Sequence, residues 1–411
     1  MFEVKGNSVS FSGIPATKLA EDFGTPLYIY DEKTIRKNCQ ALKSMVDLPN
    51  FEVFYSAKAN TNIALLKIIK SEGLKIDAMS LGELALEKEA GFEASEILFL
   101  GNNLKESDIK AVTGEGIKCC LDSLDQVERF CKIAPNTNFY IRLNPGVGTG
   151  AGHHEKVVTA GKVKFGIDLS LLDEAIILAK AQGCKVTGFM VHIGSLFLDS
   201  TPYLNAIEQL LEIAKSYPDI EYIDFGGGIG VAYDRETEQP FPFADFSEKF
   251  SKILKDWMSD TGRAPTFAME PGRFVVAESG ACLAEVQSVK TNSGVHFAGT
   301  NLGFNFLLRP EFYQAYHEII KATGLQGEKV TYNVTGNVCE SGDNLGKDRE
   351  LAKCKVGDLL LVRDTGAYGY AMASNYNSMC RPAEVLITAT GEAKLIRKRE
   401  ETADLLKNQI Y

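Results

Sequence analysis

The sequence has 411 residues, of which 45% are hydrophobic and 24% are charged, which is enough for a large core and for two domains. The net charge of −10 argues against nucleic acid or an anionic membrane surface as a partner, and no apolar stretch reaches the roughly 18–20 residues of a membrane span. Nine cysteines without C-x-x-C spacing, and an N-terminus without a basic start and apolar core, predict a reduced, cytoplasmic protein.

Two strand-like runs, Ser8–Phe11 and Pro26–Tyr30, lie within residues 1–30. From residue 31 to residue 280, apolar or β-branched runs alternate with segments of helical spacing, a pattern typical of parallel strands joined by helices. The eight runs are Val53–Ser56, Lys75–Met79, Ile97–Leu100, Lys118–Leu121, Phe139–Leu143, Val186–His192, Tyr222–Phe225 and Thr266–Met269. Eight such units predict a TIM-like (β/α)8 barrel, which usually needs roughly 250 residues.

The pattern changes after about residue 280. Four further runs with glycine-containing turns and little helix between them predict strands at Leu283–Val289, Lys329–Val334, Asp358–Val362 and Glu384–Thr388. We therefore expect a fold of α/β plus β class. Residues 281–411 would form a C-terminal β-sandwich or β-barrel domain, and residues 1–30 would supply strands that pack with it.

Residues with useful chemistry follow the predicted barrel strands, where barrel enzymes carry their active sites. Lys58, after the first strand, can hold a carbonyl cofactor as a Schiff base. Glu270, after the eighth, can keep a pyridine nitrogen protonated, and Arg273 can pair with a phosphate or carboxylate. Together they predict a pocket for pyridoxal 5'-phosphate. The alternatives are a solvated surface lysine and an ordinary Pro-Gly surface turn.

The run from Phe225 to Gly230 contains four glycines after the seventh strand, where backbone N–H groups can approach a phosphate. A dinucleotide site is the rival interpretation, but Gly226, Gly228 and Val231 do not complete G-x-G-x-x-G. His192, after the sixth strand, is either a ring that stacks on the cofactor or a core histidine, and the Gly-Ser that follows it favours the first.

Three groups of residues in the second domain add to the candidates. Cys339 lies among polar residues and can donate a proton, although a packing role is the ordinary one for cysteine. Arg309 and Tyr313 supply a cation and a phenol, and Tyr368 can meet a phosphate. The pair His153–His154 has no third ligand placed nearby, so we expect no metal site.

These motifs together resemble the fold-type III pyridoxal-phosphate-dependent decarboxylases over nearly the whole chain. The matching segments are Tyr55–Asn60, Arg142–Pro145, His192–Ser195, Gly226–Gly228, Glu270–Arg273, Arg309–Pro310 with Tyr313, Cys339–Asp343 and Gly366–Tyr368. One departure is visible: members often carry Asp-Ala-Gly-Met-Asn where this chain has Asn301–Asn305, which leaves that loop's contacts open. The resemblance implies a head-to-tail homodimer with shared active sites.

The resemblance also implies residue roles. The catalytic residues would be Lys58, Glu270, His192 and, as proton donor in the neighbouring subunit's site, Cys339. The cofactor would be bound by Lys58, His192, Ser195, Gly227, Gly228, Glu270, Pro271, Gly272, Arg273 and Tyr368. The substrate would be bound by Arg273, Arg309, Tyr313, Glu340 and Tyr368.

The implied reaction is decarboxylation of a small amino acid, and charge helps to select it. An ornithine- or lysine-type substrate carries only an ammonium at its far end, whereas meso-2,6-diaminopimelate carries an ammonium and a carboxylate. Glu340 suits the first group and Arg309 the second, which favours diaminopimelate. Alternatives are a decarboxylase of ornithine, lysine, arginine or carboxynorspermidine, alanine-racemase-like chemistry, which Glu270 opposes, and a non-catalytic cofactor-binding regulator.

Overall fold

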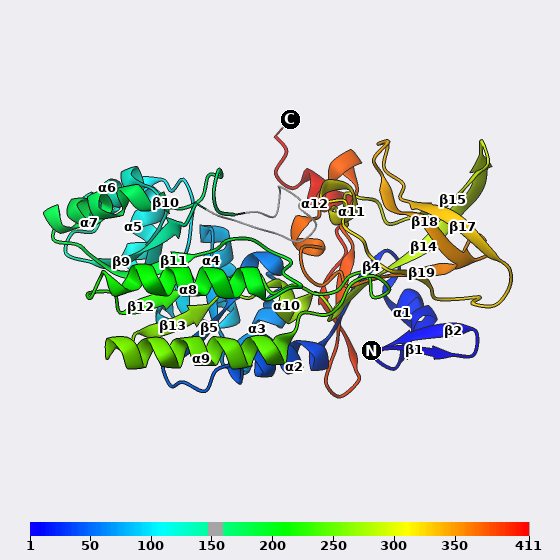
Figure 1. Cartoon of the computed structure of the whole chain (residues 1–411). Coiled ribbons are helices and arrows are strands. Elements are labelled where there is room, and N and C mark those ends of the chain that lie inside the picture. The colour runs from blue at the N-terminus through cyan, green and yellow to red at the C-terminus, as the bar shows by residue number, and fades with distance from the viewer. Residues whose placement is uncertain (147–158, 411) are drawn as a thin grey trace. The chain divides into compact units, whose positions relative to one another are not determined.

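The computed structural model describes residues 1–146 and 159–410, which divide into two compact units (Figure 1). The barrel unit comprises Lys37–Ala232 and Glu238–Val275, and the β unit comprises Met1–Arg36, Tyr233–Thr237 and Val276–Tyr411.

Eight parallel strands close the barrel. They are β5 (Phe51–Ser56), β6 (Lys75–Ala78), β7 (Ile97–Phe99), β8 (Lys118–Leu121), β9 (Asn138–Asn144), β11 (Lys185–Val191), β12 (Tyr222–Asp224) and β13 (Thr266–Met269). Each pairs in parallel with the next, and β13 pairs with β5. A short strand, β10 (Ile167–Asp168), adds to β9. The predicted TIM-like barrel is confirmed.

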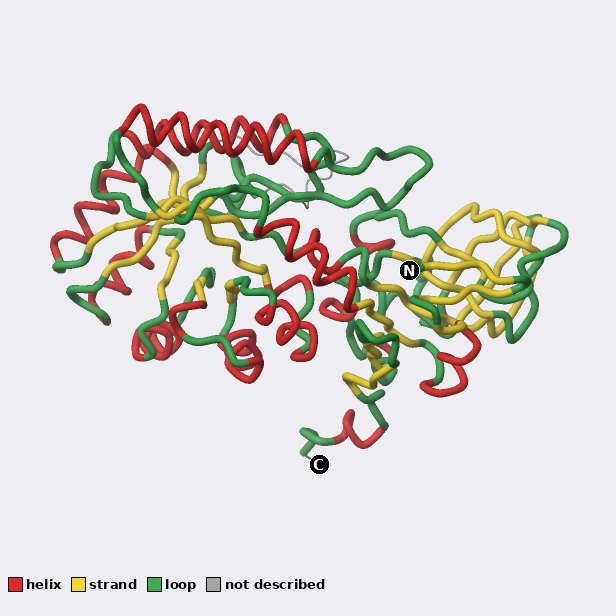
Figure 2. The backbone as a smooth tube through the Cα atoms, turned by 90° about the horizontal axis from the view of Figure 1, so that it is seen from below, coloured by secondary structure: helices red, strands yellow, loops and turns green. Residues whose placement is uncertain are grey.

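Helices lie outside these strands, as Figure 2 shows. They are α2 (Glu32–Lys43), α3 (Ile63–Ser71), α4 (Leu81–Ala90), α5 (Glu106–Gly114), α6 (Leu124–Ile133), α7 (Leu172–Ala181), α8 (Thr201–Lys215) and α9 (Phe243–Thr261). The short helix α10 (Arg273–Val276) follows β13 after three intervening residues. Polar residues after strands start the helices: Asn62 caps α3 by accepting the Ala64 N–H, and Ser80 caps α4 by accepting the Glu83 N–H. Inside the barrel, Tyr140 and Tyr222 stack with ring centroids 4.3 Å apart.

The β unit is built on strands from both ends of the chain. Its main sheet contains β4 (Leu27–Asp31), β14 (Gly280–Asn292), β15 (Val295–Thr300), β16 (Ile319–Lys321), β17 (Lys329–Thr335), β18 (Asn344–Ala352), β19 (Leu359–Arg363), β20 (Ala383–Ile387) and β21 (Ala393–Arg397). Around it are β1 (Phe2–Lys5), β2 (Ser8–Phe11), β3 (Ile14–Pro15), α1 (Ala16–Phe23), α11 (Arg309–Phe312) and α12 (Thr402–Leu406).

Strand β4 is central to this sheet, because it pairs with β14 on one side and with β20 on the other. All five of its residues are buried. Residues Val9, Phe11, Leu27 and Ile29 belong to the same hydrophobic core as Leu361. The N-terminal strands therefore complete the β unit, and the separate β domain expected from the sequence is present.

Candidate active site

Lys58 lies on the turn that leaves strand β5. The 3-10 turn Ala57–Ala59 buries both alanines and leaves Lys58 exposed between them. The Tyr55 hydroxyl donates to the Asn60 carbonyl over 3.0 Å, which fastens the turn to the strand before it. The turn therefore holds the backbone of Lys58 in place and leaves its amine exposed for reaction.

The segment Glu270–Arg273 packs directly against this turn. A Cβ atom on Gly272 would lie 2.9 Å from the Cβ of Ser56 and 3.1 Å from that of Ala59, so glycine is needed for the close approach. Arg273 Nη2 donates to Ser195 Oγ over 3.2 Å. The structure thus brings together groups from the first, sixth and eighth barrel strands.

The imidazole of His192 is tied to the glycine loop. Its Nδ1 accepts the Gly227 N–H over 3.1 Å, so the ring proton lies on Nε2. Desolvation holds the pKa of His192 well below its usual range, and the charges of Lys58 and Arg142 lower it further. His192 is therefore a neutral ring of fixed orientation.

Hydrogen bonds hold the glycine loop to the end of β12 and to the segment that follows β11. Gly226 N–H donates to Asp224 Oδ1 over 2.8 Å, and Gly230 N–H donates to the Phe197 carbonyl over 2.9 Å. No hydrogen bond from the Gly228 amide occurs within the described part of the chain. The prediction that this loop contacts a phosphate therefore rests most firmly on Gly228.

Glu270 lies in a cluster of buried acids that sequence reasoning missed. Burial raises the pKa of Glu270 well above its usual range, and the nearby carboxyl groups of Asp224 and Asp77 raise it further, while Lys58 and Arg142 oppose the shift. Burial likewise raises the pKa of Asp77 and of Asp224 to about 7. The sequence contained a signal for this cluster, because three charged residues lie inside apolar strand runs: Asp77, Asp224 and Arg142.

This cluster contains polar atoms that can bind a ligand. Glu270 Oε1 and Arg142 Nη2 are buried atoms with no hydrogen-bond partner among the described residues. An ionised Glu270 in such a place requires a nearby positive partner, because an unpaired buried charge is costly. The protonated ring nitrogen of pyridoxal phosphate is such a partner, and Lys58 supplies the amine that the cofactor's carbonyl needs.

The β unit presents Cys339 and Glu340 on an exposed loop. The Cys339 N–H donates to Asn377 Oδ1 over 2.7 Å. Two further amides, those of Phe304 and Val338, donate to the Asp343 carboxylate over 2.7 Å each. The thiol is thus exposed on a backbone that side chains hold in place.

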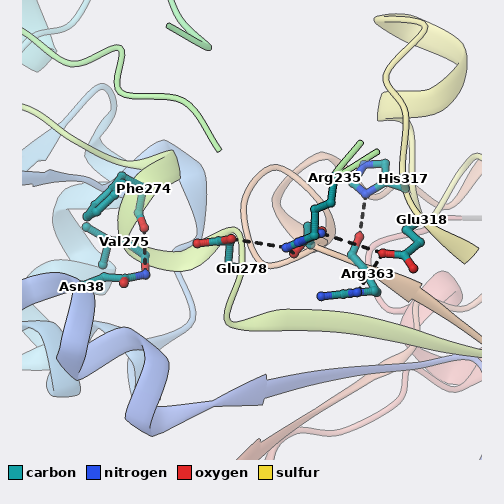
Figure 3. A network of polar contacts seen from close by, with 9 residues as sticks. Asn38, Arg235, Phe274, Val275, Glu278, His317, Glu318 and Arg363 are labelled. Atoms are coloured by element: carbon teal, nitrogen blue, oxygen red, sulfur yellow. Dashed lines mark hydrogen bonds and ion pairs between the residues drawn. The ribbon is translucent and has the colours of Figure 1, made fainter. Parts of the chain in front are cut away.

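Arg309 lies inside the β unit, with only 1% of its surface exposed. Its Nη1 donates to His317 Nε2 over 2.6 Å, and its guanidinium lies 4.3 Å from the centroid of the Tyr233 ring. His317 Nδ1 in turn donates to the Arg363 carbonyl over 2.7 Å, as Figure 3 shows. Arg235 pairs with Asp364 over 2.7 Å and so holds the neighbouring chain segment in the same unit.

The other β-unit candidates are partly exposed. Tyr313 packs edge-on against Phe312 with ring centroids 4.7 Å apart. Tyr368 has a left-handed backbone, with φ of 56°, a conformation that is uncommon outside glycine and often marks functional sites.

The Asn301–Asn305 loop, which departs from the usual motif, has defined contacts. The Asn301 carboxamide accepts the Glu285 N–H over 3.0 Å and donates to Thr25 Oγ1 over 2.8 Å. Phe304 joins the loop to Asp343, as above, so the loop supports the segment that carries Cys339. The His153–His154 pair lies outside the described residues.

All nine cysteines are free, and eight of them are at least partly buried. Within the described part of the chain, no helix combines the length and the apolarity needed to cross a bilayer.

Comparisons with known proteins identify the family of this chain. Residues 32–277 match the family model described as the pyridoxal-dependent decarboxylase, pyridoxal binding domain. Diaminopimelate decarboxylase of Methanothermobacter thermautotrophicus is 40% identical over 97% of this chain and 94% of its own, and that of Archaeoglobus fulgidus is 34% identical over 100% and 98%. The crystal structure of the M. jannaschii diaminopimelate decarboxylase with L-lysine superposes with a TM-score of 0.90, at 32% identity over 100% of this chain and 98% of that one.

A more distant structure, the lysine/ornithine decarboxylase of Vibrio vulnificus with putrescine, has a TM-score of 0.78 at 24% identity, covering 92% of this chain and 97% of that one, and shares the fold. This chain belongs to the pyridoxal-dependent decarboxylases and, within them, to the diaminopimelate decarboxylases. Its cofactor is pyridoxal phosphate.

Proposed function

We propose that this chain decarboxylates meso-2,6-diaminopimelate to L-lysine and CO2 in the cytoplasm, as a homodimer with shared active sites. The observation that carries the proposal is the meeting of the Lys58 turn, the Glu270–Arg273 segment and Ser195 at the strand ends of a barrel. The full-length similarity to diaminopimelate decarboxylases supports the choice of substrate.

The barrel unit would hold the cofactor. When bound, pyridoxal phosphate supplies an electron sink for the carbanion left by the loss of CO2. Lys58 Nζ would bind the cofactor's carbonyl carbon, and Glu270 would keep its ring nitrogen protonated. The neutral His192 ring, whose orientation Gly227 fixes, would pack on the cofactor ring.

Anionic groups would be held by the remaining barrel residues. Arg273 and Ser195 already share a hydrogen bond. Gly228 offers a backbone amide in the glycine loop, which is hydrogen-bonded to Phe197, two residues after Ser195. We assign them, with Tyr368, to the cofactor phosphate, while Arg273 and Tyr368 also contact the substrate. A charge-assisted hydrogen bond to an anion is worth about 1.5–3 kcal/mol.

The β unit would recognise the far end of the substrate. His317 and the Tyr233 ring orient the Arg309 guanidinium, and the positive charge of Arg309 suits the distal carboxylate of the substrate. Glu340 would take the distal ammonium, and Tyr313 would donate a hydrogen bond. Cys339, in the neighbouring subunit's site, would deliver the proton to the substrate's Cα.

The test is release of CO2 and lysine from meso-diaminopimelate with added pyridoxal phosphate, beside L-ornithine, L-arginine and L-lysine. Selective formation of L-lysine is expected. Turnover of a rival substrate alone would keep the fold and cofactor but reassign Glu340 and Arg309. No turnover by a protein that binds the cofactor covalently would favour the non-catalytic regulator.

A further inference from the structure

The proposed proton donor lies on an exposed loop, and exposed loops are usually mobile. Cys339, Glu340 and Ser341 are all exposed. A general acid must nevertheless be held within hydrogen-bond reach of the atom that it protonates. Some part of the β unit must therefore restrain this loop.

We propose that Asn377 is the residue that positions Cys339 for proton transfer. The inference rests on the proposed role of Cys339 and adds a residue that would act through Cys339. Its basis is the hydrogen bond of 2.7 Å from the Cys339 N–H to Asn377 Oδ1, which joins residues 38 positions apart in the chain.

This bond completes a set of restraints on the loop. Asp343 accepts the Val338 N–H at the start of the loop, and the Glu340 carboxylate accepts the Ser341 N–H over 2.8 Å. Asp343 thus holds the start of the loop through its carboxylate, and its own N–H donates to the Glu340 carbonyl over 3.1 Å. Asn377 holds the residue that bears the thiol. Among these contacts, that of Asn377 is the one made directly to the backbone of Cys339.

The backbone of Asn377 has an uncommon conformation that serves this contact. Its φ and ψ are 55° and 22°, and Ser378 follows with φ of 56°. Asparagine adopts the left-handed region more readily than most residues, but two such residues in succession persist only where the surroundings enforce them.

The surroundings do enforce them. Asn375 Nδ2 donates to the Met379 carbonyl over 2.9 Å and to Glu400 over 2.6 Å, which closes the turn on itself. Arg381 Nε donates to Glu400 over 2.7 Å, and the Arg381 N–H donates to the same carboxylate over 2.8 Å. Glu400, close to the end of the chain, thereby anchors both sides of the turn that presents Asn377.

Two substitutions separate the acceptor from the backbone conformation. Asn377→Gly keeps the left-handed conformation accessible but removes the acceptor, whereas Asn377→Asp keeps an acceptor oxygen at the same position. In the holoenzyme we expect Asn377→Gly to lower kcat by about 10- to 100-fold with KM little changed, because misplacement of a catalytic group by about 1 Å has such a cost. Asn377→Asp should retain most of the wild-type activity, because it keeps the acceptor oxygen. Ser378→Gly, at the adjacent exposed left-handed residue, is the matched control and should behave as wild type.

Two further measurements distinguish positioning from a general structural role. Amide hydrogen exchange at Cys339 should accelerate by about tenfold or more in Asn377→Gly, and not in Asn377→Asp, because a protecting hydrogen bond is lost. In a Cys339→Ala background, Asn377→Gly should cause no further fall in kcat, since residues that act as one unit are not additive.

Unchanged kcat together with unchanged exchange at Cys339 would overturn the inference. So would an equal further loss in the Cys339→Ala background. Full activity of Cys339→Ala itself would instead remove the proposed role of the thiol, and the inference with it, even if the exchange data upheld the contact. If Asn377→Gly does not fold, the kcat of Asn377→Asp and its exchange at Cys339 decide, because the retained acceptor predicts that both stay near wild type.

Discussion

The barrel unit and the β unit hold their candidate functional groups by different means. In the barrel unit, Glu270, Asp224 and Arg142 are buried at strand ends, and burial and the charges of their neighbours shift their pKa values. In the β unit, Cys339 and Glu340 are exposed, and hydrogen bonds from side chains to the backbone restrain their loop.

The difference agrees with the roles that we propose for these groups. A carboxyl group that must stay poised beside a ring nitrogen benefits from a dry environment that shifts its pKa. A thiol with the proposed role, in the active site of another subunit, has to be presented at the surface, where its backbone can be fixed by hydrogen bonds. The predictions below test this contrast, beginning with the largest expected effect.

Lys58→Ala should abolish turnover, with a loss on the order of 10³-fold or more, because it removes the covalent link on which the barrel site depends. The absorbance of the protein-bound cofactor should also change from that of an imine to that of the free aldehyde. Lys67→Ala, which removes an exposed lysine from the neighbouring helix α3, is the control. Retained imine absorbance in Lys58→Ala would show that another lysine holds the cofactor.

Cys339→Ala should reduce lysine formation by about 10²–10⁴-fold, the usual contribution of a positioned acid. Cofactor loading should be unaffected, since the barrel unit carries that task. Cys380→Ala serves as the matched control, because Cys380 is the other cysteine that is not fully buried.

Mixing Lys58→Ala with Cys339→Ala subunits should restore activity if the thiol acts across a dimer. No recovery after subunits have exchanged would place the thiol in its own subunit's site.

Arg309→Ala should lower kcat/KM for diaminopimelate more than for lysine or ornithine, by about 10- to 100-fold in the ratio, since one charge-assisted bond is lost. The ratio between substrates cancels any loss of folded protein, which matters because Arg309 is buried. Arg349→Ala is the control: this arginine also stacks on a tyrosine of the β unit, 3.9 Å from the Tyr316 centroid. Equal losses on all substrates would remove the proposed carboxylate contact.

Glu87 offers a test of the buried cluster that involves no catalysis and therefore no effect on turnover. It is fully buried on α4, and both of its carboxyl oxygens are without partners among the described residues. Burial, aided by the nearby charges of Asp77 and Glu83, raises its pKa from the ordinary 4.5 to about 9. The folded residue therefore keeps a proton that the unfolded residue releases.

The resulting contribution to stability is complete below about pH 4.5 and declines as the pH rises to about 9, by roughly 1.4 kcal/mol per unit. In cofactor-free protein, Glu87→Gln should remove this decline. Urea unfolding should then show that the free energy of unfolding of the variant increases relative to that of wild type as the pH rises from 6 to 8. Glu89→Gln, on the exposed face of the same helix, should follow wild type. A parallel pH dependence of Glu87→Gln and wild type would mean that Glu87 is ionised in the folded protein.

The barrel strands could be predicted because their sequences are short, apolar and regularly spaced. The predicted run Val186–His192, for example, corresponds to the observed strand Lys185–Val191. Several strands of the β unit were not predicted. Strand β18 (Asn344–Ala352) consists largely of polar residues, several of them exposed, so it lacks the apolar alternation on which strand prediction depends.

The sequence by itself determined the positions of Lys58, the glycine loop and Glu270–Arg273, because each belongs to a local motif that closes a predicted strand. Only the tertiary structure decided that Asp224 lies against Glu270, that His317 orients Arg309 and that Asn377 holds the Cys339 amide. The reason is physical: burial and electrostatic coupling depend on neighbours that folding brings together, and the last contact joins residues that no local pattern connects.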